Sequence, residues 1–270
     1  MVVQHNMAAS NANRQLGIST NTLSKSTEKL SSGYRINRAA DDAAGLSISE
    51  KMRSQIRGLN KASSNAQDGI SAIQTAEGAL NEAHSILQRM NELATQSAND
   101  TNTTADRTAV QSEVNALTNE LSRIASTSQF NTQNLLDGTF TGKNLQVGAL
   151  EKQKITISIG TMNATALGVN SLDVKSFTKA GAAMTLIQKA ISKVSGQRSD
   201  LGALQNRLEH TVNNLDNISE NTQTAESRIR DTDMASEMVQ YSATSIIQQA
   251  GQSMLAQANS QTQGVLSLIQ

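Results

Sequence analysis

After Leu46, apolar residues recur mostly every three or four positions for about 50 residues, and no proline interrupts them. The 270-residue chain contains no proline, which would cost a helix interior about 3 kcal/mol. This spacing places the apolar side chains on one face of an α-helix. A helix of about 50 residues is roughly 75 Å long, too long for a small globule, so the pattern predicts a long helical bundle. The pattern is formed by Ile48, Met52, Ile56, Leu59, Ala62, Ala66, Ile70, Ile73, Leu80, Ala83, Leu87, Met90 and Leu93.

The composition favours the same architecture. Aromatic residues make up 2% of the chain, although each aromatic side chain normally contributes roughly 150–250 Å² to a compact core. The apolar content is instead aliphatic, which suits the narrow seam between packed helices. Cysteine is absent, and 23 basic residues balance 23 acidic ones. These features predict no disulfides and no nucleic-acid partner.

The two ends of the chain carry similar amphipathic patterns. At the N-terminal end, Val2, Ala9, Leu16, Leu23 and Leu30 occupy one heptad position, and Gly33 then predicts a helix C-cap. At the C-terminal end the pattern continues through a possible N-cap cluster, Asp231-Thr-Asp233. A lone helix pair of this kind cannot bury its apolar seam, so we expect neighbouring copies to complete it. The C-terminal positions are Ala235, Val239, Ala243, Ile246, Ala250, Met254 and Ala258, followed by Val265-Leu-Ser-Leu-Ile269.

The middle of the chain contains a second helix and one strand-like region. A polar loop at 97–104 precedes apolar spacing from Val110 to Ile124, which predicts a helix folded back antiparallel on the long one. Alternating residues in Lys154–Ile159, with a facing run from Asn144, predict a single β-hairpin. The expected fold is therefore mainly α: a long antiparallel coiled-coil bundle formed by both chain ends, with one small β-hairpin in the middle.

These patterns predict two domains, each built from both halves of the chain. Residues 1–44 and 231–270 are expected to form an inner coiled-coil domain. Residues 45–177, including a hairpin near 144–160, and the helix at 178–230 are expected to form a second helical domain.

The sequence carries no recognisable catalytic or metal-binding arrangement. His5, His84 and His210 lack metal-ligand spacing, and the adjacent carboxylates Asp41 and Asp42 favour capping or subunit contact over catalysis. We therefore predict a structural protein without catalytic residues, cofactor or metal. No window reaches about 18 consecutive apolar residues, so we expect no membrane insertion. The first residues show no cleavable signal peptide.

Several longer motifs resemble bacterial flagellin in sequence and in order, and they cover nearly the whole chain. The N-terminal motifs are Leu30-Ser-Ser-Gly-Tyr-Arg-Ile-Asn37, Asp41-Asp-Ala-Ala-Gly-Leu46, Asn65-Ala-Gln-Asp-Gly-Ile-Ser71, Ala76-Glu-Gly-Ala-Leu-Asn-Glu82, Leu87-Gln-Arg-Met-Asn-Glu-Leu-Ala94 and Ser128-Gln-Phe-Asn131. The C-terminal motifs are Gln249-Ala-Gly251, Leu255-Ala-Gln-Ala-Asn259 and Val265-Leu-Ser-Leu268.

The resemblance implies a short, two-layer flagellin that lacks large outer domains. Such a protein polymerises with itself into the extracellular filament used for swimming, and it is exported without a cleaved signal peptide. The implied partners are a flagellar export chaperone and the filament cap and hook-junction proteins. An alternative within the same resemblance is a hook–filament junction protein.

The resemblance also suggests which side chains mediate contacts with other proteins. Gln88, Arg89, Leu93 and Glu113 match residues through which flagellins are recognised by host Toll-like receptor 5, in innate immunity. Arg89 and Glu113 are equally compatible with an ordinary solvated ion pair. For self-assembly we expect the terminal apolar positions to act: Leu16, Leu23, Leu30, Val239, Ile246, Ala250, Met254, Leu255, Val265 and Leu266.

Overall fold

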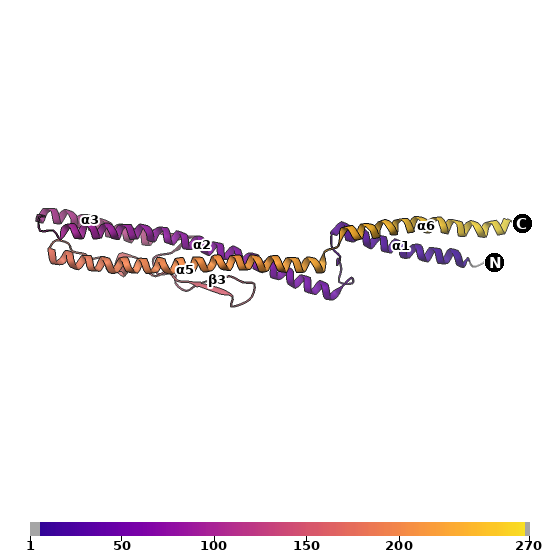
Figure 1. The fold of residues 1–270 in the computed structure, drawn as a ribbon, viewed down its shortest axis with the longest axis horizontal. Coiled ribbons are helices and arrows are strands. Elements are labelled where there is room, and N and C mark those ends of the chain that lie inside the picture. The colour runs from indigo at the N-terminus through magenta and orange to yellow at the C-terminus, as the bar shows by residue number, and fades with distance from the viewer. Residues whose placement is uncertain (1–5, 268–270) are drawn as a thin grey trace. The chain divides into compact units, whose positions relative to one another are not determined.

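The computed structural model describes the backbone of residues 6–267 and the side chains of residues 6–261. The chain forms two compact units (Figure 1), one made of Met1–Ser54 with Glu220–Gln270 and the other of Gln55–Ser219. Both borders fall inside helices, within α2 (Ala43–Ser97) and α5 (Phe177–Arg230). Long helices from both halves of the chain, with small hairpins in the middle, confirm the predicted mainly α fold.

In the first unit, α1 (Met7–Ser32) packs antiparallel against α6 (Met234–Ser267). Three contacts follow this alignment: Asn6 Nδ2 donates to the Ala258 carbonyl at 2.9 Å, Gln248 Nε2 donates to Thr20 Oγ1 at 3.2 Å, and Lys29 pairs with Glu237 at 3.5 Å. Gly33 ends α1 with a φ of 75° and donates its N–H to the Lys29 carbonyl at 2.8 Å. The predicted C-cap at Gly33 is confirmed.

Among the described residues, the side chains that are buried in the seam between α1 and α6 are small and polar. They are Ser19, Ser26 and Thr244. Ser19 and Thr244 donate their hydroxyls to carbonyls four residues back in their own helices, at 3.0 and 2.7 Å. Among the described side chains of this unit, Ile36 is the one large apolar side chain that is buried. The unit therefore contains almost no hydrophobic core of its own.

The breaks between the helices of this unit are held together by backbone hydrogen bonds. Tyr34 and Asp231 form an isolated antiparallel bridge, and Arg35 N–H donates to the Arg230 carbonyl at 2.7 Å. Asp233 Oδ1 accepts from the backbone N–H groups of Ala235 and Ser236, which confirms the predicted N-cap at the start of α6.

The adjacent carboxylates before α2 also bind backbone groups. Asp41 Oδ2 accepts from the N–H groups of Asn37 and Arg38, and Asp42 Oδ1 accepts from Gly45 N–H at 2.8 Å. The two hydrogen bonds to Asp41 lower the pKa of its carboxyl, and the bond from the Arg38 N–H is the largest cause. Both aspartates thus act as turn and helix-start acceptors.

The second unit packs the remainder of α2 and α5 with α3 (Thr104–Thr127). α3 begins with a capping box: Asp106 N–H donates to Thr103 Oγ1, and Thr103 N–H donates to the Asp106 carboxylate. A continuous apolar core runs through this unit. It includes most of the positions that carried the repeat after Leu46, among them Ala66, Ile73, Leu80, Leu87 and Met90.

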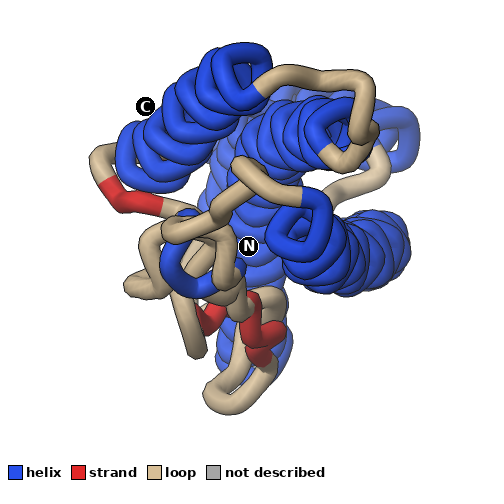
Figure 2. The backbone as a smooth tube through the Cα atoms, turned by 90° about the vertical axis from the view of Figure 1, so that its left-hand side faces the viewer, coloured by secondary structure: helices blue, strands red, loops and turns tan. Residues whose placement is uncertain are grey.

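The middle of the chain contains the predicted hairpin and a second one that we did not predict. β3 (Lys143–Gln146) pairs antiparallel with β4 (Lys154–Ile157), with Leu145 opposite Ile155. β1 (Gln129–Phe130) pairs with β2 (Gln133–Asn134), and the strands appear as short segments beside the helices (Figure 2). Asn131 and Thr132 form the tight turn with φ values of 46° and 62°, as two-residue hairpins require. Strands of two residues are too short to show an alternating pattern of apolar and polar residues in the sequence.

The segment before α5 contains a short helix, α4 (Ala164–Leu167), and is anchored by one glutamine. The buried Gln111 side chain donates to the Leu172 carbonyl and accepts from Val174 N–H, each at 2.8 Å. Ser97 Oγ also donates to the Val174 carbonyl. This irregular segment is therefore held against the C-terminal end of α2 and the N-terminal half of α3.

Candidate functional site

One face of α6 exposes a row of apolar side chains. Val239, Ile246 and Met254 have 71%, 66% and 64% of their surface exposed. The predicted Ala250 and the neighbouring Ile247 are also exposed. At about 100° per residue, these five residues lie within one side of the helix. We call Val239, Ile246, Ile247, Ala250 and Met254 the α6 apolar row.

The other predicted assembly positions on α1 and α6 are more covered. Leu16, Leu23, Leu30 and Leu255 are half-buried. A Cβ added at Gly251 would lie 3.5 Å from Leu16 Cδ1, so the α1 heptad packs against α6 of the same chain. The side chains of Val265 and Leu266 lie outside the described residues.

A groove of about 250 Å³ follows the edge of the α6 apolar row. Leu16 of α1 lines it opposite Ile247, Ala250 and Met254 of α6. An apolar groove beside exposed apolar side chains is the kind of surface on which protein partners dock. Ile247 was absent from our predicted assembly residues, although its position beside Ile246 and Ala250 in the repeat was a usable signal.

The predicted receptor residues lie where α2 and α3 pack together. Arg89 Nε and Nη2 both donate to Glu113 Oε1, at 3.1 and 2.9 Å, and Nη1 donates to Glu92 Oε2 at 3.2 Å. Gln88 is exposed beside them, and its Nε2 lies 3.0 Å from His84 Nε2. Three of the predicted residues therefore form one polar surface. We did not predict Glu92 and His84 as part of this surface. Helical spacing identifies both, because Glu92 lies three residues after Arg89 and His84 lies four residues before Gln88.

Leu93 occupies a different environment from the other three. Its side chain is 2% exposed and belongs to the core of the second unit. It supports α2 beneath the polar surface, and its side chain is not available for direct contact in this conformation. The apolar repeat that includes Leu93 and Met90 was the sequence signal for this burial.

The Arg89–Glu113 pair is exposed enough to be a weak contributor to stability. The two side chains keep 51% and 45% of their surface accessible, and pairs as exposed as this contribute little to stability. The hydrogen bond with Glu113 is the largest cause that raises the pKa of Arg89. The hydrogen bonds to Glu113 and Glu92 orient the guanidinium at this surface.

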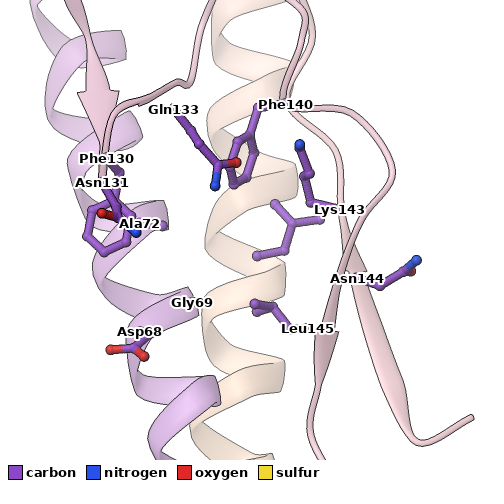
Figure 3. Close-up of a pocket in the computed structure, with 11 residues that line it drawn as sticks. Asp68, Gly69, Ala72, Phe130, Asn131, Gln133, Phe140, Lys143, Asn144 and Leu145 are labelled. Atoms are coloured by element: carbon purple, nitrogen blue, oxygen red, sulfur yellow. The ribbon is translucent and has the colours of Figure 1, made fainter.

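A cavity of about 250 Å³ lies between α2 and the two hairpins. Figure 3 shows that Asp68, Gly69 and Ala72 of α2 line it together with Phe130, Phe140 and Leu145 from the hairpin region. Its polar side chains, which include Asp68 and Lys143, do not combine a nucleophile with a base. In the described part of the chain, no three His, Asp or Glu residues lie close enough to hold a metal ion. No helix in the described residues combines the length and the apolar character that a membrane span requires.

Comparisons with known proteins identify the family of the chain. Residues 3–141 match the bacterial flagellin N-terminal helical region, and residues 184–269 match the bacterial flagellin C-terminal helical region. Flagellin of Halalkalibacterium halodurans is 55% identical over 271 residues, which cover all of both chains. Flagellin of Bacillus subtilis is 49% identical over 304 residues, again with full coverage of both. The flagellar filament 33 kDa core protein of Treponema phagedenis is 51% identical over 285 residues, with full coverage.

Solved structures show the same fold. The crystal structure of Bacillus cereus flagellin is 32% identical and aligns with a TM-score of 0.50 over 56% of this chain and 88% of that one. A putative flagellar hook-associated protein from Vibrio parahaemolyticus aligns with a TM-score of 0.61 over 71% of this chain and 100% of its own. At 14% identity this second likeness extends to the fold alone. The chain belongs to the bacterial flagellin family and is a structural subunit of the flagellar filament.

Proposed function

We propose that copies of this chain polymerise through the α6 apolar row and the adjoining groove between α1 and α6. The observation that carries this proposal is the high exposure of Val239, Ile246 and Met254 in a unit that buries Ile36 as its one large apolar side chain among those described. Burial of a large aliphatic side chain contributes about 1.5–3 kcal/mol. Association with another copy supplies that burial to residues that the single chain leaves in water.

The contact joins different surfaces of the two copies. Val239 and Ile246 of one copy lie outside the groove residues of the next, and the groove adds Leu16 of α1, so a contact between them is heterologous. Heterologous contacts generate open helical polymers when their rotation does not close a ring. A filament is the expected product.

A charge placed on the row tests the proposal. Ile246→Glu is expected to abolish polymerisation, because assembly would bury a carboxylate without a partner. Gln252→Glu adds the same charge to an exposed position on the far side of α6 and is expected to polymerise normally. Sedimentation of filaments after seeding measures both. Normal assembly of Ile246→Glu would contradict the proposal.

The alternative of a hook–filament junction protein makes a different quantitative prediction. A filament subunit makes up the bulk of an isolated appendage, whereas a junction protein contributes a few copies. Full-length identity of 49–55% to flagellins favours the filament subunit. Labelled antibodies that decorate isolated filaments along their length would support it, and label confined to the base would support the junction protein.

We further propose that Gln88, Arg89 and Glu113 contact Toll-like receptor 5. The supporting observation is the pair of hydrogen bonds that holds Arg89 on Glu113 at an exposed surface. Leu93 has a supporting role because it is buried.

Receptor binding can be tested with a matched arginine elsewhere. Arg89→Ala is expected to weaken binding to the receptor ectodomain at least tenfold, because it removes an oriented cation. Arg123→Ala removes a comparable exposed arginine, which pairs with Glu120 on α3, and is expected to bind normally. Equal loss in both variants, measured by surface plasmon resonance, would contradict a specific role for Arg89.

We expect the export and capping partners to bind the same apolar row. An export chaperone that covers α6 would keep Ile246 and its neighbours from aggregating before assembly. Ile246→Glu is then expected to weaken chaperone binding in calorimetry, whereas Gln252→Glu is not. Filament cap and hook-junction proteins would contact the same terminal helices. Export without a cleaved signal peptide predicts that filament protein retains its N-terminal sequence, which intact-mass analysis measures.

A further inference from the structure

The methionines of the chain differ sharply in their access to solvent. Met90 is fully buried in the core of the second unit, and Met162 is also buried. Met254 and Met238 on α6 are instead largely exposed, with Met254 at 64%. A thioether reacts with dissolved oxidants according to its exposure. The folded chain should therefore be oxidised selectively at its exposed methionines.

Met7 on α1, at 75%, and Met234 on α6, at 46%, are exposed as well, but neither lines the groove, so Met254 differs from the other exposed methionines in its surroundings. It belongs to the α6 apolar row and lines the groove opposite Leu16, with Ile247 and Ala250 beside it. Met238 lies sixteen residues earlier, which places it about 160° away around the helix. Oxidation of the two residues would therefore change different faces of α6.

We propose that Met254 is an oxidative modification site, and that its conversion to the sulfoxide by a peroxide stops the chain from polymerising. The effect on assembly rests on the proposed contact through the α6 apolar row, whereas the selectivity of oxidation rests on exposure alone.

The reaction is a two-electron oxygen transfer. A lone pair of the Met254 sulfur attacks one oxygen of hydrogen peroxide, so that an S–O bond forms and the O–O bond breaks. The departing hydroxide takes the proton from the transferred oxygen and leaves as water. The sulfur is oxidised, the peroxide is reduced, and sulfoxide reductases reverse the change.

The sulfoxide opposes assembly because it is polar. In the free chain its oxygen is hydrated, since Met254 faces solvent. In the polymer it would enter an apolar contact. The polar residues of the groove are Gln15 and Ser19, and the Ser19 hydroxyl already donates to the Gln15 carbonyl. A hydrogen-bond acceptor that loses water without gaining a partner weakens association. Unmodified Met254 becomes covered on assembly, so finished filaments should resist oxidation there.

The test treats monomer and filament with hydrogen peroxide and maps the oxidised peptides by mass spectrometry. In the monomer, Met254 is expected to react at least tenfold faster than Met90 or Met162. In the filament, its oxidation is expected to slow at least tenfold. Oxidised monomer is expected to need at least a tenfold higher concentration to polymerise, and reductase treatment should restore assembly. Unreacted Met254, or normal assembly of fully oxidised monomer, would overturn the proposal.

Matched variants identify the responsible sulfur. Met254→Leu keeps an apolar side chain without a sulfur, so it is expected to polymerise before and after peroxide. Met238→Leu is expected to remain peroxide-sensitive. Equal sensitivity of Met254→Leu and the unaltered chain would overturn the assignment. If Met254→Leu itself does not polymerise, reductase rescue of the oxidised unaltered chain decides, because failure of rescue refutes a sulfoxide effect.

The same experiments separate this inference from the proposed assembly surface. If Ile246→Glu polymerises normally, the proposed contact is wrong. If Ile246→Glu fails to polymerise while oxidised monomer assembles normally, the contact stands and the inference about Met254 is wrong.

Discussion

Arg230 lies against the ring of Tyr34, with its guanidinium carbon 4.7 Å from the ring centroid. The same guanidinium donates from Nη1 to Glu50 Oε1 at 2.6 Å. Arg230 ends α5, Tyr34 follows α1, and Glu50 belongs to the first turns of α2. The Arg230 side chain therefore connects the break between α1 and α2 with the break between α5 and α6.

Removal of the Tyr34 ring should loosen these breaks. A cation–π contact contributes about 0.5–2 kcal/mol, so Tyr34→Ala is expected to speed hydrogen exchange at Arg35 and Thr232. Their N–H groups donate across the two breaks, to the carbonyls of Arg230 and Gly33. Tyr34→Phe keeps the ring and should retain slow exchange. Equal exchange rates in Tyr34→Ala and the unaltered chain would show that the bridge does not depend on the ring.

Glu50 should make the first unit sensitive to acid. The hydrogen bond from Arg230 is the largest cause that lowers the pKa of Glu50 below its ordinary 4.5. Because the folded pKa is the lower one, the interaction stabilises the folded unit above pH 4.5 and is lost as the pH falls through the folded value.

Titration of the Glu50 carboxyl carbon by nuclear magnetic resonance measures this shift. In Arg230→Gln the midpoint is expected to move up toward the ordinary value. Glu120, whose pKa is lowered chiefly by its own hydrogen bond with Arg123, provides the internal control and should not move. An unchanged Glu50 midpoint in the variant would exclude Arg230 as the cause.

The core of the second unit should be sensitive to lost volume. Leu80 is fully buried among the apolar residues of α2, α3 and α5, and such leucine-to-alanine changes cost about 2–5 kcal/mol. Leu80→Ala is expected to lower the free energy of unfolding in urea by that amount. Leu186→Ala removes an exposed leucine of α5 and should have a much smaller effect. Similar losses in both variants would mean that burial does not explain the difference.

Gln111 should be necessary for anchoring the segment before α5. Gln111→Met fills a similar volume but leaves the Leu172 carbonyl and the Val174 N–H without this partner. Each buried group left unpaired costs about 1–3 kcal/mol, so thermal unfolding should shift to a lower temperature. Ser112→Ala alters the exposed neighbour and should leave the transition unchanged. A Gln111→Met variant as stable as the unaltered chain would contradict the anchoring role.

The helices and several of their ends follow from local patterns along the chain. The apolar positions that include Ile73, Leu80 and Leu87 recur with the helical period. This period alone predicts one apolar stripe on a helix, whichever element packs against it. Gly33 and Asp233 act within one turn of their own helix, and local chemistry therefore suffices to predict caps at both. The hairpin at 143–157 was predictable because the alternation in β4 spans enough residues.

Which side chains remain in water depends on the packing of the folded chain. The same periodic pattern runs through Leu93, which is buried, and through Ile246, which is exposed, because burial depends on what packs opposite a helix face. The strands of the β1–β2 hairpin are too short to show a pattern. The hydrogen bonds of Gln111 depend on residues that are distant along the chain. Periodicity specifies a face of a helix, and the partner that covers that face belongs to the folded chain or to the next copy.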